Sequence, residues 1–377
     1  MNRKKATYQH WVSESLPLSL TQQIERLRNL NDVKHVRIMP DAHLAHDVCI
    51  GSVLASDSLI YPRAIGGDIG CGMLAAEFTC AADAIGTREA KAILTLLRHR
   101  VPIIKQPKEN ICSEAFQQIE CSLSHRALSA LADKAGRIQL GTLGRGNHFL
   151  ELQKDACSGA LWVMIHTGSR AMGPAIRDHY ETLSSNTSGG LHYLQATSPI
   201  GQHYLQDHNW ARSYAAMNRR VILQQIENII FQVLGVKPVN ALGIDCDHNH
   251  LQQETHDNEV LWVHRKGASA VHKNCLAIIP GSMGTPSFHV IGKGNQQSLC
   301  SSSHGAGRCM SRHEAKKRVS FHRLQNEMEG IFYEKKQSRQ LVEESPSAYK
   351  DISKVMKAQK KLVTIKRKLL PILSYKG

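Results

Sequence analysis

Five side chains that can bind metal ions lie far apart in the sequence, each in a glycine-rich turn or after an apolar stretch. They are Asp68, Cys71, His148, His166 and His248. A carboxylate, a thiolate and three imidazoles suffice for two ions if the thiolate bridges them. None of the five has the short Cys-x-x-Cys spacing of a structural zinc site, which argues against a zinc finger. The mixed donors suit Mn²⁺, Zn²⁺, Co²⁺ or Fe²⁺, and the residue types leave all four open.

A sixth histidine, His304, lies among small residues in the segment Ser301–Arg308. The glycines that follow it allow the backbone to approach a ligand closely and to expose N–H groups. Arg308 offers a planar, charged fork that suits phosphate. A histidine in this setting is either a nucleophile toward phosphorus or a structural residue of a buried loop, and the octapeptide leaves both interpretations open.

Several arginines and lysines also lie beside glycines. We interpret five of them as candidate phosphate contacts: Arg170, Arg265, Lys266, Arg308 and Arg312. Metal ligands next to phosphate-binding side chains favour phosphoryl or nucleotidyl transfer.

Short apolar strands, each followed by a glycine-rich or charged loop, would hold these side chains in place, because loops on a rigid sheet often carry sites. The pattern predicts strands at 36–38, 50–54, 162–165, 239–245, 260–263, 276–279 and 288–291. A broad apolar face predicts a helix over Ser213–Leu234. The polar segment 174–212 is interpreted as a surface excursion that covers a site. A last helix is expected at about Ile352–Gln359.

The chain of 377 residues carries 47 Lys and Arg against 32 Asp and Glu, a formal net charge of +15. This excess predicts attraction to polyanions, with nucleic acid as the leading candidate. From residue 350 onward there are nine Lys or Arg and one acid, Asp351. That run is either a solvated basic face or a surface that helps to hold RNA.

We expect a cytoplasmic protein without a membrane partner. No apolar run approaches the roughly 18 residues needed to span a bilayer, and no apolar run follows the basic start, so a secretory signal is not expected. The ten cysteines show no disulfide framework, which favours reduced thiols. Without a repeat or a linker, residues 1–377 are expected to form a single domain.

Taken together, these segments make the chain resemble the RtcB family of GTP-dependent RNA-splicing ligases. The stretches that carry the resemblance run in family order: Met39-Pro40-Asp41-Ala42-His43, Gly67–Met73, Gly144-Arg145-Gly146-Asn147-His148-Phe149, His166–Arg170, Cys246-Asp247-His248-Asn249, His264–Ala268, Pro280–Thr285, Ser303–Arg308 and Lys376-Gly377.

The resemblance implies an α+β fold: a single RtcB-type domain, with mixed sheets and flanking helices around a central metal and nucleotide cleft. It implies two metal ions, usually Mn²⁺. Asp68, Cys71 and His148 would hold one ion, and Cys71, His166 and His248 would hold the other, with Cys71 bridging.

The resemblance also implies a GTP site, in which His304 attacks the α-phosphorus, becomes guanylylated and releases pyrophosphate. Lys376 would reach the guanine. The implied GTP contacts are Asn147, His148, Phe149, Leu150, Glu151, His248, Asn249, Pro280, Gly281, Ser282, Met283, Ser287, His304, Gly305, Ala306, Gly307 and Lys376.

The reaction implied by the resemblance joins an RNA 3′-phosphate or 2′,3′-cyclic phosphate to a 5′-hydroxyl through an RNA-3′-pp-G intermediate. The substrates would be tRNA or rRNA fragments, with Arg170, Arg308 and Arg312 as RNA-phosphate contacts and an archease-type protein as an activator. Two alternatives are a metal-dependent RNA cyclic phosphodiesterase and a non-catalytic RNA-binding paralogue. The His304 loop and Lys376 argue against the first, because hydrolysis needs no guanine pocket.

Three positions depart from the usual family pattern: Asp247 replaces a histidine, His250 a common tyrosine and Ala171 a glycine. These changes and the shorter chain resemble a bacterial branch found beside the release-factor homologue PrfH, which implies RNA repair.

Overall fold

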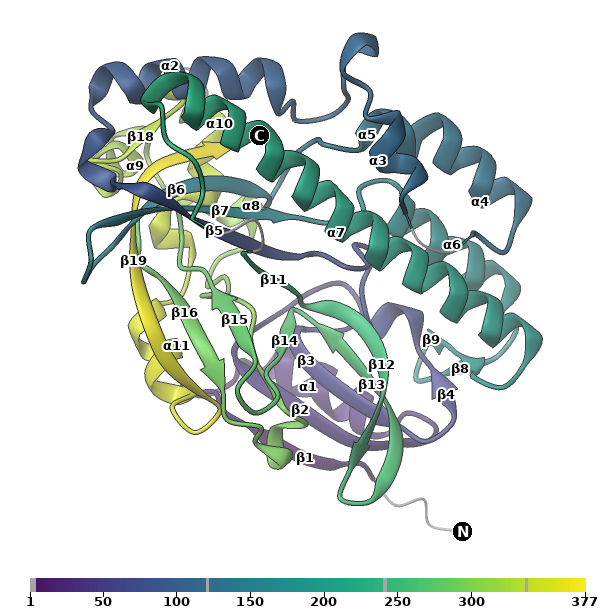
Figure 1. The fold of residues 1–377 in the computed structure, drawn as a ribbon. Coiled ribbons are helices and arrows are strands. Elements are labelled where there is room, and N and C mark those ends of the chain that lie inside the picture. The colour runs from purple at the N-terminus through teal and green to yellow at the C-terminus, as the bar shows by residue number, and fades with distance from the viewer. Residues whose placement is uncertain (1–4, 120–121, 240–242, 336–337) are drawn as a thin grey trace.

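Two β-sheets frame the protein, and a computed structural model describes residues 5–119, 122–239, 243–335 and 338–377 (Figure 1). The larger sheet has eight strands, with β18 (Phe332–Tyr333) paired to β19 beside the main order. That order is β11 (Ile244–Asp247), β5 (Gly72–Ala81), β7 (Ala160–Thr167), β6 (Phe149–Asp155), β19 (Val363–Lys376), β16 (Ser287–Gly292) and β15 (Leu276–Ile279).

The smaller sheet has five strands, and its pairs are antiparallel except for β1 with β2. Its order is β1 (Thr7–His10), β2 (Val33–His43), β3 (Ile50–Ser56), β13 (Glu259–Lys266) and β12 (Asn249–His256). Successive side chains of a strand face opposite sides. Val53 therefore joins the core shared with β16, while Leu54 packs in the core formed with helix α1 (Leu18–Arg28).

Two helices cover the outer face of the larger sheet, at the top of Figure 1. They are α2 (Thr87–Arg100) and α7 (Pro199–Leu234). Apolar residues spaced three or four apart on each helix, such as Leu97 and Ile226, pack with Val163 of β7 in one core.

Shorter elements connect these layers. The helices are α3 (Ser113–Gln117), α4 (Arg126–Leu131), α5 (Arg137–Gln139), α6 (Met172–Leu183), α8 (Arg312–Arg318), α9 (Phe321–Glu327), α10 (Ser338–Leu341) and α11 (Ile352–Ala358). Two-stranded pairs form between β4 (Leu59–Ile60) and β10 (Leu194–Gln195), β8 (Thr187–Ser188) and β9 (Leu191–His192), and β14 (Ala268–Ala270) and β17 (Ser301–Ser303).

The helix predicted at 213–234 is present, but it begins fourteen residues earlier, at Pro199. Ser198 caps its start by accepting a hydrogen bond from the Gly201 backbone N–H at 3.0 Å. The prediction of a surface excursion through 212 is wrong, because polar residues of this segment are buried. Asp207 is fully buried and accepts a 2.6 Å hydrogen bond from the Tyr180 hydroxyl.

The predicted α+β architecture, with mixed sheets and flanking helices, is confirmed. The last predicted helix corresponds to α11, whereas the basic end of the chain forms the long strand β19, which the pattern did not predict. Residues 240–242 of the strand expected at 239–245 lie outside the described residues. No helix in the described part of the chain combines the length and apolar character needed to cross a membrane.

Candidate active site

The strand register of the larger sheet brings three candidate metal ligands together. Neighbouring strands pair Met73 with His166, and His166 with Phe149. Cys71 directly precedes β5 and His148 directly precedes β6, so both lie at the sheet end where β7 carries His166. Three ligands from three segments thus share one edge.

The other two candidates are fixed by main-chain contacts around the same edge. The His248 backbone N–H donates to the Cys71 carbonyl at 2.9 Å. Asp68 accepts a 2.9 Å hydrogen bond from the Ser169 backbone N–H. A Cβ added at Gly168 would overlap the Asp68 carboxylate, so a glycine is required at this close approach.

The five donors form two triads that share Cys71, and the ligand atoms of each triad lie within 4.8 Å of one another. One triad is Asp68, Cys71 and His148; the other is Cys71, His166 and His248. The Cys71 Sγ lies 3.5 Å from His148 Nε2 and 3.3 Å from His166 Nε2. Ligands about 2.0–2.3 Å from one ion in tetrahedral geometry lie roughly 3.3–3.8 Å apart. The donor set therefore fits metal ions.

Hydrogen bonding and burial prepare these side chains to bind cations. His166 Nδ1–H donates to the Asn147 carbonyl at 2.9 Å, which leaves Nε2 as the ligand atom. Burial lowers the pKa of His166 and His248 well below the ordinary value, so both imidazoles are neutral. Burial also raises the pKa of the Cys71 thiol, and a bound cation would oppose that effect by stabilising the thiolate.

His304 lies next to the metal-ligand triads and is oriented by a buried carboxylate. The His304 and His248 ring centroids are 4.8 Å apart. The Asp41 carboxylate accepts a 2.6 Å hydrogen bond from His304 Nδ1 and a 3.2 Å one from its backbone N–H. This pairing leaves Nε2 as the ring nitrogen that can accept a bond. Although burial favours the neutral acid, the charge and hydrogen bond of His304 keep the pKa of Asp41 below its ordinary value.

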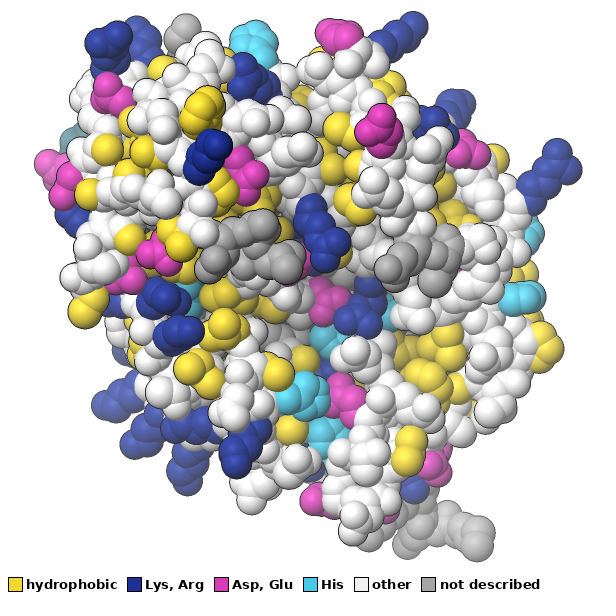
Figure 2. All heavy atoms as spheres, in the orientation of Figure 1, with side chains coloured by type: hydrophobic (Ala, Val, Ile, Leu, Met, Phe, Trp, Pro, Cys, Tyr) yellow, Lys and Arg dark blue, Asp and Glu magenta, His cyan; other side chains and the backbone are white. Residues whose placement is uncertain are grey.

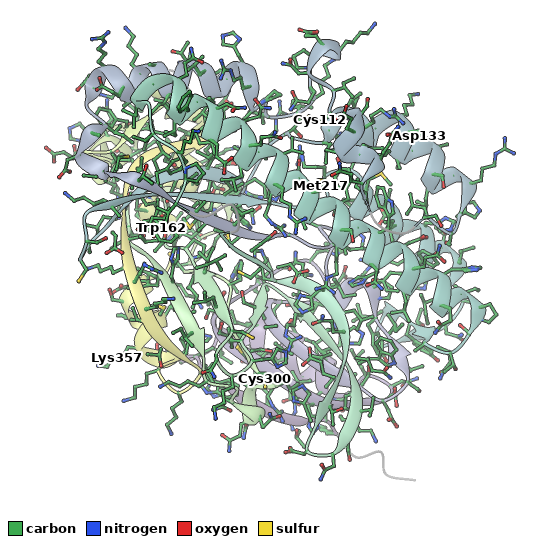
Figure 3. The ribbon with its side chains drawn as sticks, viewed as in Figure 1. Cys112, Asp133, Trp162, Met217, Cys300 and Lys357 are labelled. Carbon is green, nitrogen blue, oxygen red and sulfur yellow. The ribbon has the colours of Figure 1, made fainter. Side chains whose placement is uncertain are left out.

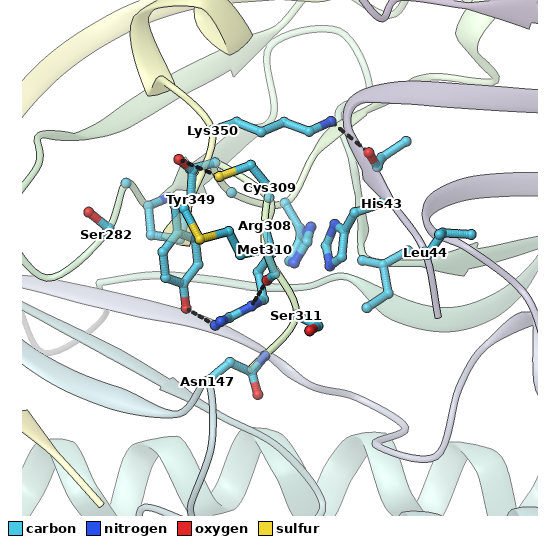
Figure 4. Close-up of a pocket in the computed structure, with 18 of the residues that line it drawn as sticks. His43, Leu44, Asn147, Ser282, Arg308, Cys309, Met310, Ser311, Tyr349 and Lys350 are labelled. Atoms are coloured by element: carbon cyan, nitrogen blue, oxygen red, sulfur yellow. Dashed lines mark hydrogen bonds between the residues drawn. The ribbon is translucent and has the colours of Figure 1, made fainter. Parts of the chain in front are cut away.

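A cavity of about 740 Å³ opens in front of His304. Figure 4 shows Tyr349 and Arg308 on one side of it and His43 with Leu44 on the other. The predicted GTP contacts that line this cavity are Asn147, Phe149, Glu151, Pro280, Gly281, Ser282, Met283, Ser287, His304, Gly305, Ala306, Gly307 and Lys376.

Four predicted GTP contacts are not among the residues lining the cavity. His148 and His248 belong to the ligand triads. Leu150 is fully buried in the core beneath α2 and α7, because it alternates with Phe149 and Glu151 along β6. The Asn249 side chain instead connects two loops. Its Nδ2 donates to the Asp68 carbonyl at 3.1 Å, and its Oδ1 accepts from the Gly267 backbone N–H at 2.8 Å.

The cavity wall around Phe149 and Lys376 combines an aromatic ring with buried charges. The Lys376 Nζ lies 5.5 Å from the Phe149 ring centroid and 2.7 Å from a Glu344 carboxylate oxygen. Burial opposes ionisation of Glu344, but the charge and hydrogen bond of Lys376 lower its pKa to about 2. Burial raises the pKa of Glu151 to about 8, which leaves a neutral carboxyl group in the wall at neutral pH.

The predicted phosphate contacts have different environments. Arg308 is engaged by protein: it donates to the Glu343 carbonyl at 2.6 Å and pairs with Glu344 at 3.2 Å. Arg312 pairs with Glu344 at the same distance but remains 46 % exposed. Arg170 donates to the Ile103 carbonyl at 3.2 Å. Their contacts with RNA stay predictions.

The prediction that Arg265 contacts phosphate is wrong. Its side chain is fully buried and pairs with Glu254. It also donates to the Ser301 hydroxyl at 3.0 Å, so the guanidinium helps to hold the strand that leads to His304. Lys266, the remaining candidate, is largely buried, and this burial lowers its pKa to about 8.

Sequence reasoning missed the residues that support the site. Asp41 belongs to one of the motifs that carry the resemblance, but the sequence alone predicts no role for it. Arg219 of α7 is almost fully buried and donates to the Gly70 carbonyl at 2.9 Å, and its neighbour Asn218 donates to the Thr142 carbonyl at 3.1 Å. Two adjacent polar residues within an otherwise apolar helix face were the only sequence signal for this support.

Two of the unusual residues contact each other beside His248. His250 Nδ1 lies 2.8 Å from an Asp247 carboxylate oxygen, and Arg212 of α7 pairs with Asp247 at 2.7 Å. Although burial opposes its ionisation, the charges of His250 and Arg212 hold the pKa of Asp247 well below the ordinary value. Asp247, which replaces a histidine of the usual family pattern, thus adds an ion pair with Arg212 of α7.

Comparisons with known proteins agree with this arrangement. The family model described as "tRNA-splicing ligase RtcB" matches residues 23–377. The chain is 35 % identical over 373 residues to the RNA-splicing ligase RtcB of Escherichia coli strain K12, covering 91 % of this chain and 90 % of the relative. It is 28 % identical over 402 residues to the tRNA-splicing ligase RtcB of Aeropyrum pernix, covering 85 % and 83 % respectively. The chain therefore belongs to the RtcB family of RNA ligases.

Proposed function

We propose that this protein is a GTP-dependent RNA ligase that joins a 3′-phosphate or 2′,3′-cyclic phosphate end to a 5′-hydroxyl end. Residues 1–377 would act as one ligase domain. The observation that carries the proposal is the position of His304, which lies between two metal-ligand triads and a large cavity and is held by Asp41 at 2.6 Å.

His304 is the proposed nucleophile. With Nδ1 bound to Asp41, its Nε2 attacks the α-phosphorus of GTP, and pyrophosphate leaves with the electron pair of the broken bond. The guanine would lie near Phe149 and Lys376, which both line the cavity. Glycines 305 and 307 would let the main chain approach the nucleotide.

The triads would hold two divalent cations, which we propose to be Mn²⁺, through Asp68, Cys71, His148, His166 and His248. When bound, such ions orient phosphates and offset the charge that develops on them.

The remaining steps use the RNA ends. A cyclic phosphate is first opened to a 3′-phosphate. GMP then passes from His304 to that phosphate, and the 5′-hydroxyl displaces GMP to form the new phosphodiester. Arg170 and Arg312 are proposed to contact the RNA phosphates, and an archease-type protein to assist repeated turnover. Because Asp247, His250 and Ala171 resemble the branch found beside PrfH, we propose a role in RNA repair on tRNA or rRNA fragments.

Incubation with Mn²⁺ and α-labelled GTP tests the proposal. We expect covalent labelling of the protein and the subsequent joining of RNA pieces that carry 2′,3′-cyclic phosphate and 5′-hydroxyl ends. His304→Ala should abolish both, while His272→Ala, which changes an exposed histidine outside the cavity, should retain both. Cyclic ends consumed without GTP and without joined product would instead indicate a phosphodiesterase.

A further inference from the structure

Lys and Arg side chains, dark blue in Figure 2, gather on the lower left of the molecule, near the end of α11 and the start of β19. Figure 3 shows one of them, Lys357, pointing outward from this region. This lysine patch consists of Lys273, Lys293, Lys357, Lys360, Lys361, Lys366 and Lys368.

Backbone pairing brings the patch together from three segments. Strands β16 and β19 pair Gly292 with Val363. The Lys293 backbone N–H donates to the Leu362 carbonyl at 2.9 Å, and its Nζ donates to the Lys360 carbonyl at 2.6 Å. These contacts fix the main chain of Lys293 beside the start of β19.

The charges of the patch are not neutralised by the protein. No carboxylate lies within 4.0 Å of these seven ammonium groups among the described residues, and the sequence has no acid after Asp351. Neighbouring cations differ: Lys354 pairs with Glu14 at 3.1 Å, and Arg367 lies 3.6 Å from an Asp155 oxygen. Clustered like charges repel one another and attract a polyanion.

The patch is connected to the cavity by two elements. Lys350 lines the cavity, and α11 (Ile352–Ala358) begins two residues later; the helix spans about 10 Å, and Lys361 follows three residues after its end. Along β19, Lys368 lies about 26 Å from Lys376, which also lines the cavity.

We propose that the lysine patch binds the phosphate backbone of the RNA several nucleotides away from the end that reacts. The proposal rests on the proposed ligase function. At about 3.4 Å per nucleotide of a helical strand, the distance of about 26 Å along β19 corresponds to roughly eight nucleotides. Lysines act as point charges toward phosphate, so the contact is independent of RNA sequence.

The test compares two proteins that lose the same number of charges. The patch variant is Lys357→Gln/Lys361→Gln/Lys366→Gln/Lys368→Gln. The control is Arg88→Gln/Lys91→Gln/Lys134→Gln/Arg220→Gln, which changes exposed residues of α2, α7 and the segment after α4. Each is assayed with RNA pieces of three and of thirty nucleotides, and RNA binding is measured by filter retention over a range of salt concentrations.

For the thirty-nucleotide pieces we expect the patch variant to lose about tenfold or more in kcat/KM at 0.1 M salt. Its log–log salt slope for RNA binding should become shallower by about 3, at roughly 0.7–0.9 per lost contact. Joining of three-nucleotide pieces and labelling by GTP should match the control.

Equal salt slopes for the two variants would overturn the proposal, and so would an equal loss on short and long RNA. Failure of the unaltered protein to be labelled by GTP would refute the ligase function instead. RNA binding measured by filter retention would still test the lysine patch in that case.

Discussion

Replacing Asp41 with asparagine tests whether His304 is prepared for attack by its buried partner. Asp41 is fully buried and His304 is 15 % exposed, so water cannot replace the 2.6 Å hydrogen bond between them. A hydrogen bond to a charged group contributes about 1.5–3 kcal/mol. At 1.36 kcal/mol per factor of ten, its loss predicts a guanylylation rate lower by roughly 10- to 160-fold. An amide NH₂ facing Nδ1 would also place the imidazole proton on Nε2, the attacking atom.

The assay is a single-turnover measurement of label transfer from α-labelled GTP, together with equilibrium binding of GTP. We expect slower transfer and little change in GTP affinity. Asp57→Asn serves as the control, because Asp57 is exposed and its partner Lys34 is 3.7 Å away. A transfer rate within twofold of the unaltered protein would refute the view that Asp41 orients the nucleophile.

Three further predictions concern the metal ligands, acid stability and the core. Cys71→Ser should reduce the bound Mn²⁺ from two ions to one or fewer by elemental analysis, because Cys71 belongs to both triads; two retained ions would contradict a bridging role. The lowered pKa of Glu344 predicts stability that is present above about pH 4.5 and is lost as the pH falls toward 2, and Glu344→Gln should flatten this decline in thermal unfolding experiments. Leu150→Ala should lower the free energy of unfolding by about 2–5 kcal/mol without changing the Kd of GTP. A higher Kd would indicate that Leu150 contacts the nucleotide.

The five candidate metal ligands could be predicted from the sequence, because the ability to bind a metal ion follows from the residue type. A thiolate, a carboxylate and histidines next to glycines stand out wherever the chain folds. The geometry that joins them, such as the pairing of Met73 with His166, depends on contacts between distant strands and is not encoded in any local pattern.

Residues whose role depends on burial were harder to predict. Asn218 and Arg219 look like ordinary polar residues of a helix, yet both are buried and hold the loops of the site. Arg265 looks like a phosphate contact beside a glycine, yet it is enclosed with Glu254. Strand alternation likewise separates Leu150 from its neighbours, because adjacent residues face opposite sides of a sheet.

The spread of the metal ligands along the chain also bears on the order in which the protein matures. Asp68 and His248 are separated by 248 − 68 = 180 positions, and His304 follows later still. Two ions held by the triads and joined through Cys71 would cross-link these segments and limit the conformations of the unfolded chain, as a disulfide does for a long loop. Ions that bind only the assembled form shift the folding equilibrium by mass action. Metal supply during synthesis would therefore set the yield of folded protein, since the second triad is complete only once residue 248 has emerged.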